Sequence, residues 1–190
     1  MTSAPTLRPT AAPFGSPPIT IVAVSGNPKA ESRTLSVARL VGARIAAALP
    51  GARLADPIDI ATFAAELAGR DHPVADAARR TLAAASVVVI ATPVYKASFT
   101  GLLKLFLDGY GPNGLGGVVA VPVVVSASPA HALVGEVHLR PVLVELGAVV
   151  PTRSFTVVES QLGDVEGLVE NWWEHAGVAL ARQTGAELRR

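Results

Sequence analysis

The sequence predicts an α/β protein built on a doubly wound, five-stranded parallel sheet with helices on both faces. Half of its 190 residues are hydrophobic, mostly Ala, Val and Leu, and only 16% are charged. This composition is typical of a sheet that is buried on both sides. Short β-branched runs also alternate with segments of helical apolar spacing, and this order provides the crossover connections that parallel strands need. The length suits one domain with a large core.

Five segments are expected to form the strands of this sheet. Residues 19–25 and 86–91 are buried β-branched runs, 52–60 is a weaker candidate, and 155–158 supplies the last strand. Residues 118–126 form another strand, but Pro122 within it cannot donate to a ladder. We therefore expect a bulge at this proline, or a strand limited to one side of it.

Helical segments follow the strands. Apolar residues recur every three or four positions after Ser32, which predicts a helix that packs on the sheet. Further helices are expected over 75–85, 98–108, 130–146 and 163–188. Gly109 and a Gly/Pro-rich loop end the helix 98–108. The helix 130–146 is expected to be interrupted or kinked near Pro141.

Composition and spacing exclude several classes of function. The net charge is +1 and no basic stripe is interleaved with aromatic residues, so no nucleic-acid partner is expected. The chain has no cysteine, which excludes disulfides, thiolate zinc sites and a cysteine nucleophile. The four histidines show no metal-ligand spacing, and no metal site is predicted. Any redox chemistry must therefore come from a bound cofactor.

The sequence predicts no membrane segment. No apolar run approaches the ~18 residues that span a bilayer, and the N-terminus lacks the pattern of a secretory signal. We interpret the proline-rich residues 1–18 as a flexible tail before a single domain at 19–190. A cytoplasmic location is expected.

Three polar segments follow predicted strands, at 25–34, 92–98 and 126–131. In a doubly wound sheet, ligands bind outside the carboxyl ends of the strands, near the point where the strand order reverses. The three segments lie far apart in sequence, but this fold would gather them at one edge. Their convergence predicts a ligand site.

The first segment, Ser25-Gly-Asn-Pro-Lys-Ala-Glu-Ser-Arg-Thr34, connects a buried strand to a helix N-terminus, where free N–H groups and the helix dipole favour a phosphate. Ser25, Ser32 and Thr34 offer hydroxyl groups, and Arg33 offers a charged fork. The patterns GxGxxG and GxxxxGK[ST] are absent, so a single phosphate suits the loop better than a pyrophosphate. Ser32 as a simple helix cap, with a turn at Asn27-Pro28, is an equally valid interpretation.

The second segment crosses the end of the central strand at Pro93, Val94, Tyr95 and Lys96. A flat, mostly apolar ring with polar edges could lie against this backbone, with Tyr95 as a ring contact and Lys96 as a nearby positive charge. The alternative is an ordinary turn between strand and helix. For Lys96 alone that alternative is favoured, because lysine side chains are mostly solvated.

Two of these segments resemble a known family. Ala91-Thr-Pro-Val-Tyr-Lys-Ala-Ser-Phe-Thr-Gly-Leu-Leu-Lys104 resembles the flavin-ring loop of the FMN reductases that serve two-component alkanesulfonate monooxygenases. Ser25-Gly-Asn-Pro, together with Ser32-Arg33-Thr34, is similar to the FMN phosphate loop of that family. The resemblance covers residues 19–158.

This resemblance implies a flavodoxin-like subunit that binds FMN and takes hydride from NAD(P)H. It places the FMN phosphate at Ser25, Ser32, Arg33 and Thr34, with Asn27 as a further cofactor-binding residue of the same loop. The isoalloxazine ring would lie along Pro93, Val94, Tyr95 and Lys96. Ser126, Ala127 and Ser128 would close the other side. Hydride passes directly from nicotinamide to flavin, so no catalytic side chain is expected. The resemblance also implies an even homo-oligomer, a homodimer or homotetramer, and a flavin-dependent monooxygenase as a partner.

The chain departs from the family in two places. Relatives commonly carry a glycine-rich third loop, where this chain reads Ser126-Ala-Ser-Pro-Ala-His131. Some relatives have an inserted aromatic residue on the next helix, linked to their tetramer interface, whereas Val134-Gly-Glu-Val-His-Leu139 contains no Tyr. Whether FMN is a substrate or a prosthetic group, and whether NADH or NADPH is preferred, therefore stay open. The alternatives are an FMN-retaining quinone, azo or metal-oxyanion reductase and, less favoured at this net charge, a flavodoxin-like electron carrier.

Overall fold

A computed structural model of the chain describes residues 18–188. Its sheet has the order β2-β1-β4-β5-β6, and β3 also pairs with β1. Every strand pair is parallel. The strands are β1 (Thr20–Ser25), β2 (Arg53–Leu54), β3 (Ile58–Asp59), β4 (Val87–Pro93), β5 (Val119–Ser126) and β6 (Phe155–Val158). The helices are α1 (Arg33–Ala48), α2 (Pro73–Ala83), α3 (Gly101–Leu107), α4 (Arg140–Glu145) and α5 (Val165–Thr184). All but the last residue of the predicted tail lie outside the described range.

The weak strand expected over 52–60 consists of two short strands. β2 pairs with the start of β1 and β3 with its end, where Asp59 lies opposite Ser25. Pro57 lies between the two strands, and its lack of an N–H group favours this break. β2 and β3 together fill one position of the sheet, so the predicted five-stranded doubly wound fold is confirmed.

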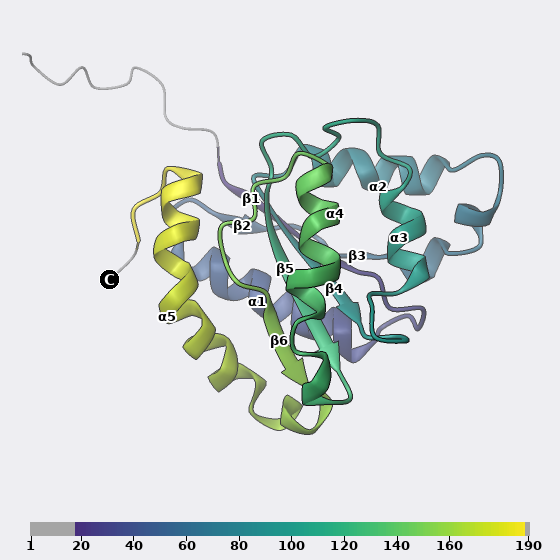
Figure 1. The fold of residues 1–190 in the computed structure, drawn as a ribbon. Helices are drawn as coiled ribbons and strands as arrows, with labels where there is room; N and C mark the ends of the chain where they lie inside the picture. The colour runs from purple at the N-terminus through teal and green to yellow at the C-terminus, as the bar shows by residue number, and fades with distance from the viewer. Residues whose placement is uncertain (1–17, 189–190) are drawn as a thin grey trace, which may run out of the picture.

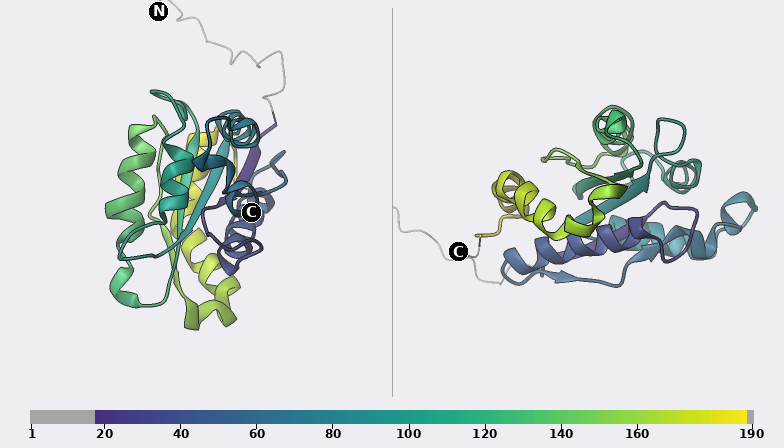
Figure 2. Two further views of the ribbon diagram at one scale, coloured as in Figure 1. Left: turned by 90° about the vertical axis from the view of Figure 1, so that its right-hand side faces the viewer. Right: turned by 90° about the horizontal axis from the view of Figure 1, so that it is seen from below.

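Helices cover both faces of the sheet, as the views in Figures 1 and 2 show. Helices α1 and α5 pack on one face, over a cluster that includes Ile21, Val89 and Trp173. On the opposite face, α2, α3 and α4 cover a cluster that includes Val22 and Phe106. Side chains of successive strand residues point to opposite faces. Because both faces are covered, the central strands are apolar along most of their length, and their polar residues lie at or near the strand ends.

The bulge expected at Pro122 is absent from β5, which pairs with β4 along its whole length. The N–H group of Val119 points toward the β4 side, and that of Ala120 points to the opposite side. Since backbone N–H groups alternate along a strand, the nitrogen of Pro122 faces away from β4. The ladder to β6 begins only at Val123, opposite Phe155. The proline therefore interrupts no hydrogen bond with β4 and lies just before the β6 ladder.

Two predicted helices differ in their starts. The helix expected from 98 begins at Gly101, after Thr100, which caps it. The segment 130–146 comprises a 3₁₀ turn at Pro129–His131, a π-helix at Gly135–Leu139 and then α4. The predicted interruption near Pro141 is confirmed, because the π-helix gives way to α4 at Arg140. Pro141 lies in the first turn of α4, which continues directly from the π-helix.

Glu136 links the π-helix to the residues just before β6 through hydrogen bonds. One of its carboxylate oxygens accepts the backbone N–H and the hydroxyl of Ser154, at 2.6 and 2.7 Å. The other oxygen accepts a hydrogen bond from Nε of Arg140 at 2.7 Å. Arg140 also donates to the carbonyl oxygens of Val150 and Thr152. Burial alone would raise the pKa of Glu136, but the bonds from Arg140 and Ser154 outweigh it and lower the pKa to about 2.

This network predicts a loss of stability in acid. The folded-state pKa of Glu136 is below its ordinary value of 4.5. Its contribution is therefore complete above about pH 4.5 and is lost as the pH falls toward 2. A shift of this size corresponds to roughly 3 kcal/mol. Urea denaturation between pH 2 and 6 should show that the Glu136→Gln variant is less stable than wild type at pH 6. The difference should shrink in acid, and a constant difference would contradict the assignment.

Among residues 18–188, no helix has both the length and the apolar character that crossing a bilayer requires.

Candidate functional site

The structure brings the three predicted segments together at the carboxyl edge of the sheet. Ser25 at the end of β1 is in register with Ala91 of β4, and Pro93 is in register with Val125 of β5. Backbone bonds continue this pairing beyond the strands. The N–H of Gly26 donates to the carbonyl of Ala91 at 2.8 Å, and Val94 donates to Val125 at 3.1 Å. The site is therefore one continuous rim of strand ends.

The loop from Ser25 to Thr34 is bonded within itself. The side-chain amide of Asn27 donates to the Thr34 hydroxyl at 3.0 Å, and its carbonyl accepts the N–H of Lys29 at 2.9 Å. The Ser25 hydroxyl accepts the N–H of Asn27 at 3.3 Å. Asn27 thus links the start of the loop to the first turn of α1. Its amide stabilises the shape of the loop in which the phosphate is predicted to bind.

The N-terminus of α1 provides free backbone donors. The Ser32 hydroxyl accepts the N–H of Leu35 at 3.3 Å, so Ser32 is the helix cap. Within the described chain, the N–H groups of Arg33 and Thr34 have no acceptor, and the first turn contains no acidic residue. Ser32 and Thr34 are buried beside these donors. Capping by Ser32 and binding of an anion to the free donors are therefore compatible.

Arg33 is the charged member of the predicted phosphate set. It forms an ion pair of 3.0 Å with Glu159, which directly follows β6. The exposed fractions of the two side chains are 66% and 46%. Because exposed ion pairs contribute little free energy, Arg33 can exchange this partner for another anion.

Thr100 joins the first loop to the second and was missed as a site residue in the sequence. Its hydroxyl donates to the carbonyl of Gly26 at 2.5 Å, and its N–H donates to the Thr92 hydroxyl at 3.2 Å. It is buried, and it also caps α3 through the N–H of Leu103 at 3.1 Å. The only sequence signal is a threonine before a helix, which indicates a cap but no contact across the site.

The second loop has a strained backbone. Tyr95 and Ser98 exchange backbone hydrogen bonds of 2.9 and 3.1 Å, and Lys96 and Ala97 between them have φ values of 50° and 61°. This is the geometry of a type I′ turn, which favours glycine or asparagine. The N–H groups of Lys96 and Ala97 have no acceptor in the described part of the chain. They could therefore donate to a ligand, and Tyr95 beside them is 53% exposed.

Replacement of Ala97 by glycine should stabilise the protein. The left-handed conformation destabilises a residue other than glycine by about 1–2 kcal/mol. Glycine removes this strain but loses about 0.5–1 kcal/mol of conformational entropy on folding, so the free energy of unfolding should rise by about 0.5–1 kcal/mol. Urea denaturation measures this change. Ala84→Gly is the control: Ala84 is also exposed but has a φ of −88°, and its replacement should destabilise the protein. Equal destabilisation by both changes would contradict the claim that the backbone at Ala97 is strained.

A contact from the π-helix supports this loop. Nδ1 of His138 lies 3.2 Å from the Ser98 hydroxyl. Position 138 belongs to the segment where the sequence lacks the inserted Tyr of some relatives. The segment is a π-helix, and it contacts the second loop through His138.

The third loop follows β5. The hydroxyl of buried Ser126 donates to the carbonyl of Ser128 at 3.0 Å. The Ser128 hydroxyl accepts the N–H of Ala130 at 3.3 Å and caps the turn that follows. Ala127 between them is exposed. The two serines therefore fix the loop, and the backbone near Ala127 is accessible.

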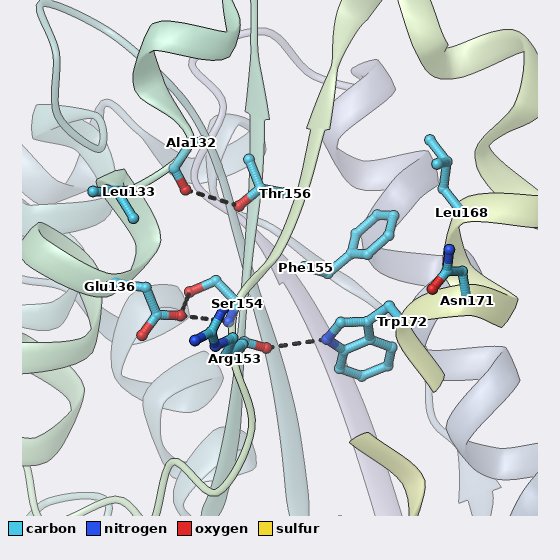
Figure 3. A pocket seen from close by; sticks show the side chains of 10 residues that line it. All are labelled: Ala132, Leu133, Glu136, Arg153, Ser154, Phe155, Thr156, Leu168, Asn171 and Trp172. Atoms are coloured by element: carbon cyan, nitrogen blue, oxygen red, sulfur yellow. Dashed lines mark hydrogen bonds between the residues drawn. The ribbon is translucent and has the colours of Figure 1, made fainter. Parts of the chain in front are cut away.

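A large hollow lies away from these loops, along the outer edge of β6 (Figure 3). It has a volume of about 570 Å³, and none of the predicted site residues lines it. Hydrogen bonds drawn in the figure cross its wall: Trp172 donates Nε1 to the carbonyl of Arg153, Glu136 accepts from Ser154, and the Thr156 hydroxyl donates to the carbonyl of Ala132. Glu136 and Gln161 accept the N–H groups of Ser154 and Val158. The free edge of the sheet is thereby capped.

The fold and the rim together define a flavodoxin-like α/β protein with a phosphate-compatible loop and a strained second loop at the point where the strand order reverses. Comparison with known proteins agrees. The model of the NADPH-dependent FMN reductase family matches residues 19–162. The chain therefore belongs to this family, which confirms the predicted family and class of enzyme, an oxidoreductase that acts on FMN with a nicotinamide nucleotide.

Individual relatives differ in the extent of the match. An FMN reductase (NADPH) of Pseudomonas putida is 34% identical over 97 residues, which is 51% of this chain and about half, 49%, of that protein. The NADH-dependent FMN reductase SfnE of Pseudomonas putida is 30% identical over 159 residues, covering 78% of this chain and 82% of that protein. The crystal structure of an apo NADH:FMN oxidoreductase superposes with a TM-score of 0.73 at 32% identity, covering 87% of this chain and 88% of that one.

Proposed function

We propose that this chain binds FMN across its three strand-end loops and transfers a hydride from NAD(P)H to it. The main observation is the set of free N–H donors at the start of α1, beside buried hydroxyl groups and next to a strained loop with free donors of its own. The residues proposed for the phosphate loop are Ser25, Asn27, Ser32, Arg33 and Thr34; those for the ring are Pro93, Val94, Tyr95, Lys96, Ser126, Ala127 and Ser128.

The protein contributes orientation and charge. FMN, when bound, supplies the ring that accepts the hydride of the nicotinamide, without a protein nucleophile. The free N–H groups of Lys96 and Ala97 would hold the polar edge of the ring. The Lys96 ammonium would place a positive charge beside a ring that gains electrons. Tyr95 remains exposed, and it offers an apolar surface beside the ring.

An anaerobic assay tests the proposed reaction. Purified protein mixed with FMN and either NADH or NADPH should bleach the flavin absorbance band at a rate proportional to enzyme concentration. The ratio of the two rates gives the nicotinamide preference. Absence of bleaching with both nucleotides would overturn the proposed function.

We further propose that the chain works as an even oligomer in the cytoplasm and passes reduced FMN to a monooxygenase. Support comes from the resemblance to reductases that serve such enzymes, and from the exposed ion pair that occupies Arg33. Loss of FMN during gel filtration should accompany this role. A yellow protein after gel filtration would favour the alternative of an FMN-retaining reductase.

A further inference from the structure

We propose that Asp59, a carboxylate on a neighbouring strand, holds the phosphate loop in its binding shape and is a positioning residue for FMN. This inference rests on the proposed function. Asp59 ends β3, and it lies in register with Ser25 at the end of β1. It is therefore at the same edge of the sheet as the loop that begins at Ser25.

The contact between Asp59 and the loop is direct. Its Oδ2 accepts the backbone N–H of Glu31 at 2.8 Å, although 28 residues separate the two. Its Oδ1 accepts the N–H of Ala61 at 3.4 Å, which caps the turn after β3. The residue is 8% exposed. A carboxylate removed from water in this way needs its hydrogen bonds, so the bond to Glu31 is a fixed part of the fold.

Glu31 is held in an unfavourable conformation. Its φ is 48°, in the left-handed region, where side chains other than glycine and asparagine are rare. Glu31 directly precedes Ser32, the cap of α1. The bond from Asp59 therefore fixes the backbone at the residue where the loop turns into the helix. Strained residues of this kind occur at binding sites when the surrounding structure holds them.

The bond uses one donor of the loop and leaves the others free. Asp59 takes the N–H of Glu31, while the N–H groups of Arg33 and Thr34 remain without an acceptor among residues 18–188. Without Asp59, the chain before Ser32 could relax from its positive φ and turn these donors away. The loss would affect the phosphate of FMN and not the ring, because the second loop has no bond to Asp59.

Riboflavin lacks the phosphate, so the ratio of the affinities for FMN and riboflavin reports on phosphate binding. A residue with a purely structural role would not change this ratio. In wild type, FMN should bind at least tenfold more tightly than riboflavin by fluorescence titration. Asp59→Ala should reduce that preference at least fivefold, with the riboflavin affinity unchanged within twofold. Asp59→Asn keeps an acceptor oxygen and should retain the wild-type preference. Asp56→Ala, an exposed acid before β3, is the matched control and should behave as wild type.

A second variant removes the donor instead of the acceptor. Glu31→Pro has no N–H group and cannot adopt a positive φ, so it should reproduce the effect of Asp59→Ala without touching the turn after β3. Glu31→Gly keeps the N–H and suits the φ value, and it should retain the preference for FMN. The double variant of Asp59→Ala and Glu31→Pro should lose no more than either single change, because both break one bond.

The outcomes separate the two proposals. Equal affinity of wild type for FMN and riboflavin would overturn the placement of the phosphate in this loop, and with it the role of Asp59. A wild-type preference for FMN that survives both Asp59→Ala and Glu31→Pro would overturn the role of Asp59 alone. If Asp59→Ala does not fold, Glu31→Pro decides the question.

Discussion

Replacement of Gly26 by alanine is expected to damage both stability and FMN binding. A Cβ atom at position 26 would lie 2.5 Å from Cβ of Leu103, a buried residue of α3 whose backbone must move to relieve the clash. The same movement would stretch the bond from Thr100 to the carbonyl of Gly26. Overpacking of this kind costs about 1–3 kcal/mol. We expect a lower urea midpoint and at least a tenfold higher KM for FMN.

Gly163→Ala is the matched control, because a Cβ atom there meets nothing within 4 Å. Its stability and kinetics should remain close to those of wild type. A Gly26→Ala variant with the stability and KM of wild type would show that the first loop and α3 are not held together as described.

Replacement of Arg33 by glutamine is expected to raise the KM for FMN by about 10–100-fold. This range follows from the roughly 1.5–3 kcal/mol that a hydrogen bond to a charged group contributes. The guanidinium group is exposed, and its only ion pair in the described chain is with Glu159, so it is available to a phosphate. Steady-state rates with FMN and riboflavin test this contact. The kcat should change less than twofold, and riboflavin kinetics should not change.

Arg44→Gln is the control that removes a positive charge from α1 without removing a predicted phosphate contact. Arg44 also belongs to α1, but it pairs with Glu170 of α5 and packs on the ring of Trp173. Its removal should leave the ratio between the FMN and riboflavin KM values unchanged. An equal effect of both variants, or a loss of riboflavin activity in Arg33→Gln, would contradict a direct contact between Arg33 and the phosphate.

The features that follow from local pattern were predictable. Residues 87–91 are apolar without interruption because both faces of the sheet are covered. The ends of such runs also indicated where the polar segments begin. The cap at Ser32 follows from its residue type and its position before an apolar periodic segment. Fold and rim could therefore be predicted together.

The features that depend on distant contacts were not predictable. The bond from the N–H of Glu31 to Asp59 and the bond from Thr100 to the carbonyl of Gly26 join segments far apart in sequence. The turn at Lys96-Ala97 has no glycine or asparagine to signal it. Pro122 indicated a bulge because sequence alone does not reveal toward which neighbour its nitrogen points.

A crystal structure of the chain with FMN would test the central claim most directly. We predict the phosphate within hydrogen-bond distance of the N–H groups of Arg33 and Thr34, and the ring against the backbone from Pro93 to Ala97. FMN in the hollow beside β6, or a phosphate that makes no contact with the first turn of α1, would contradict the account.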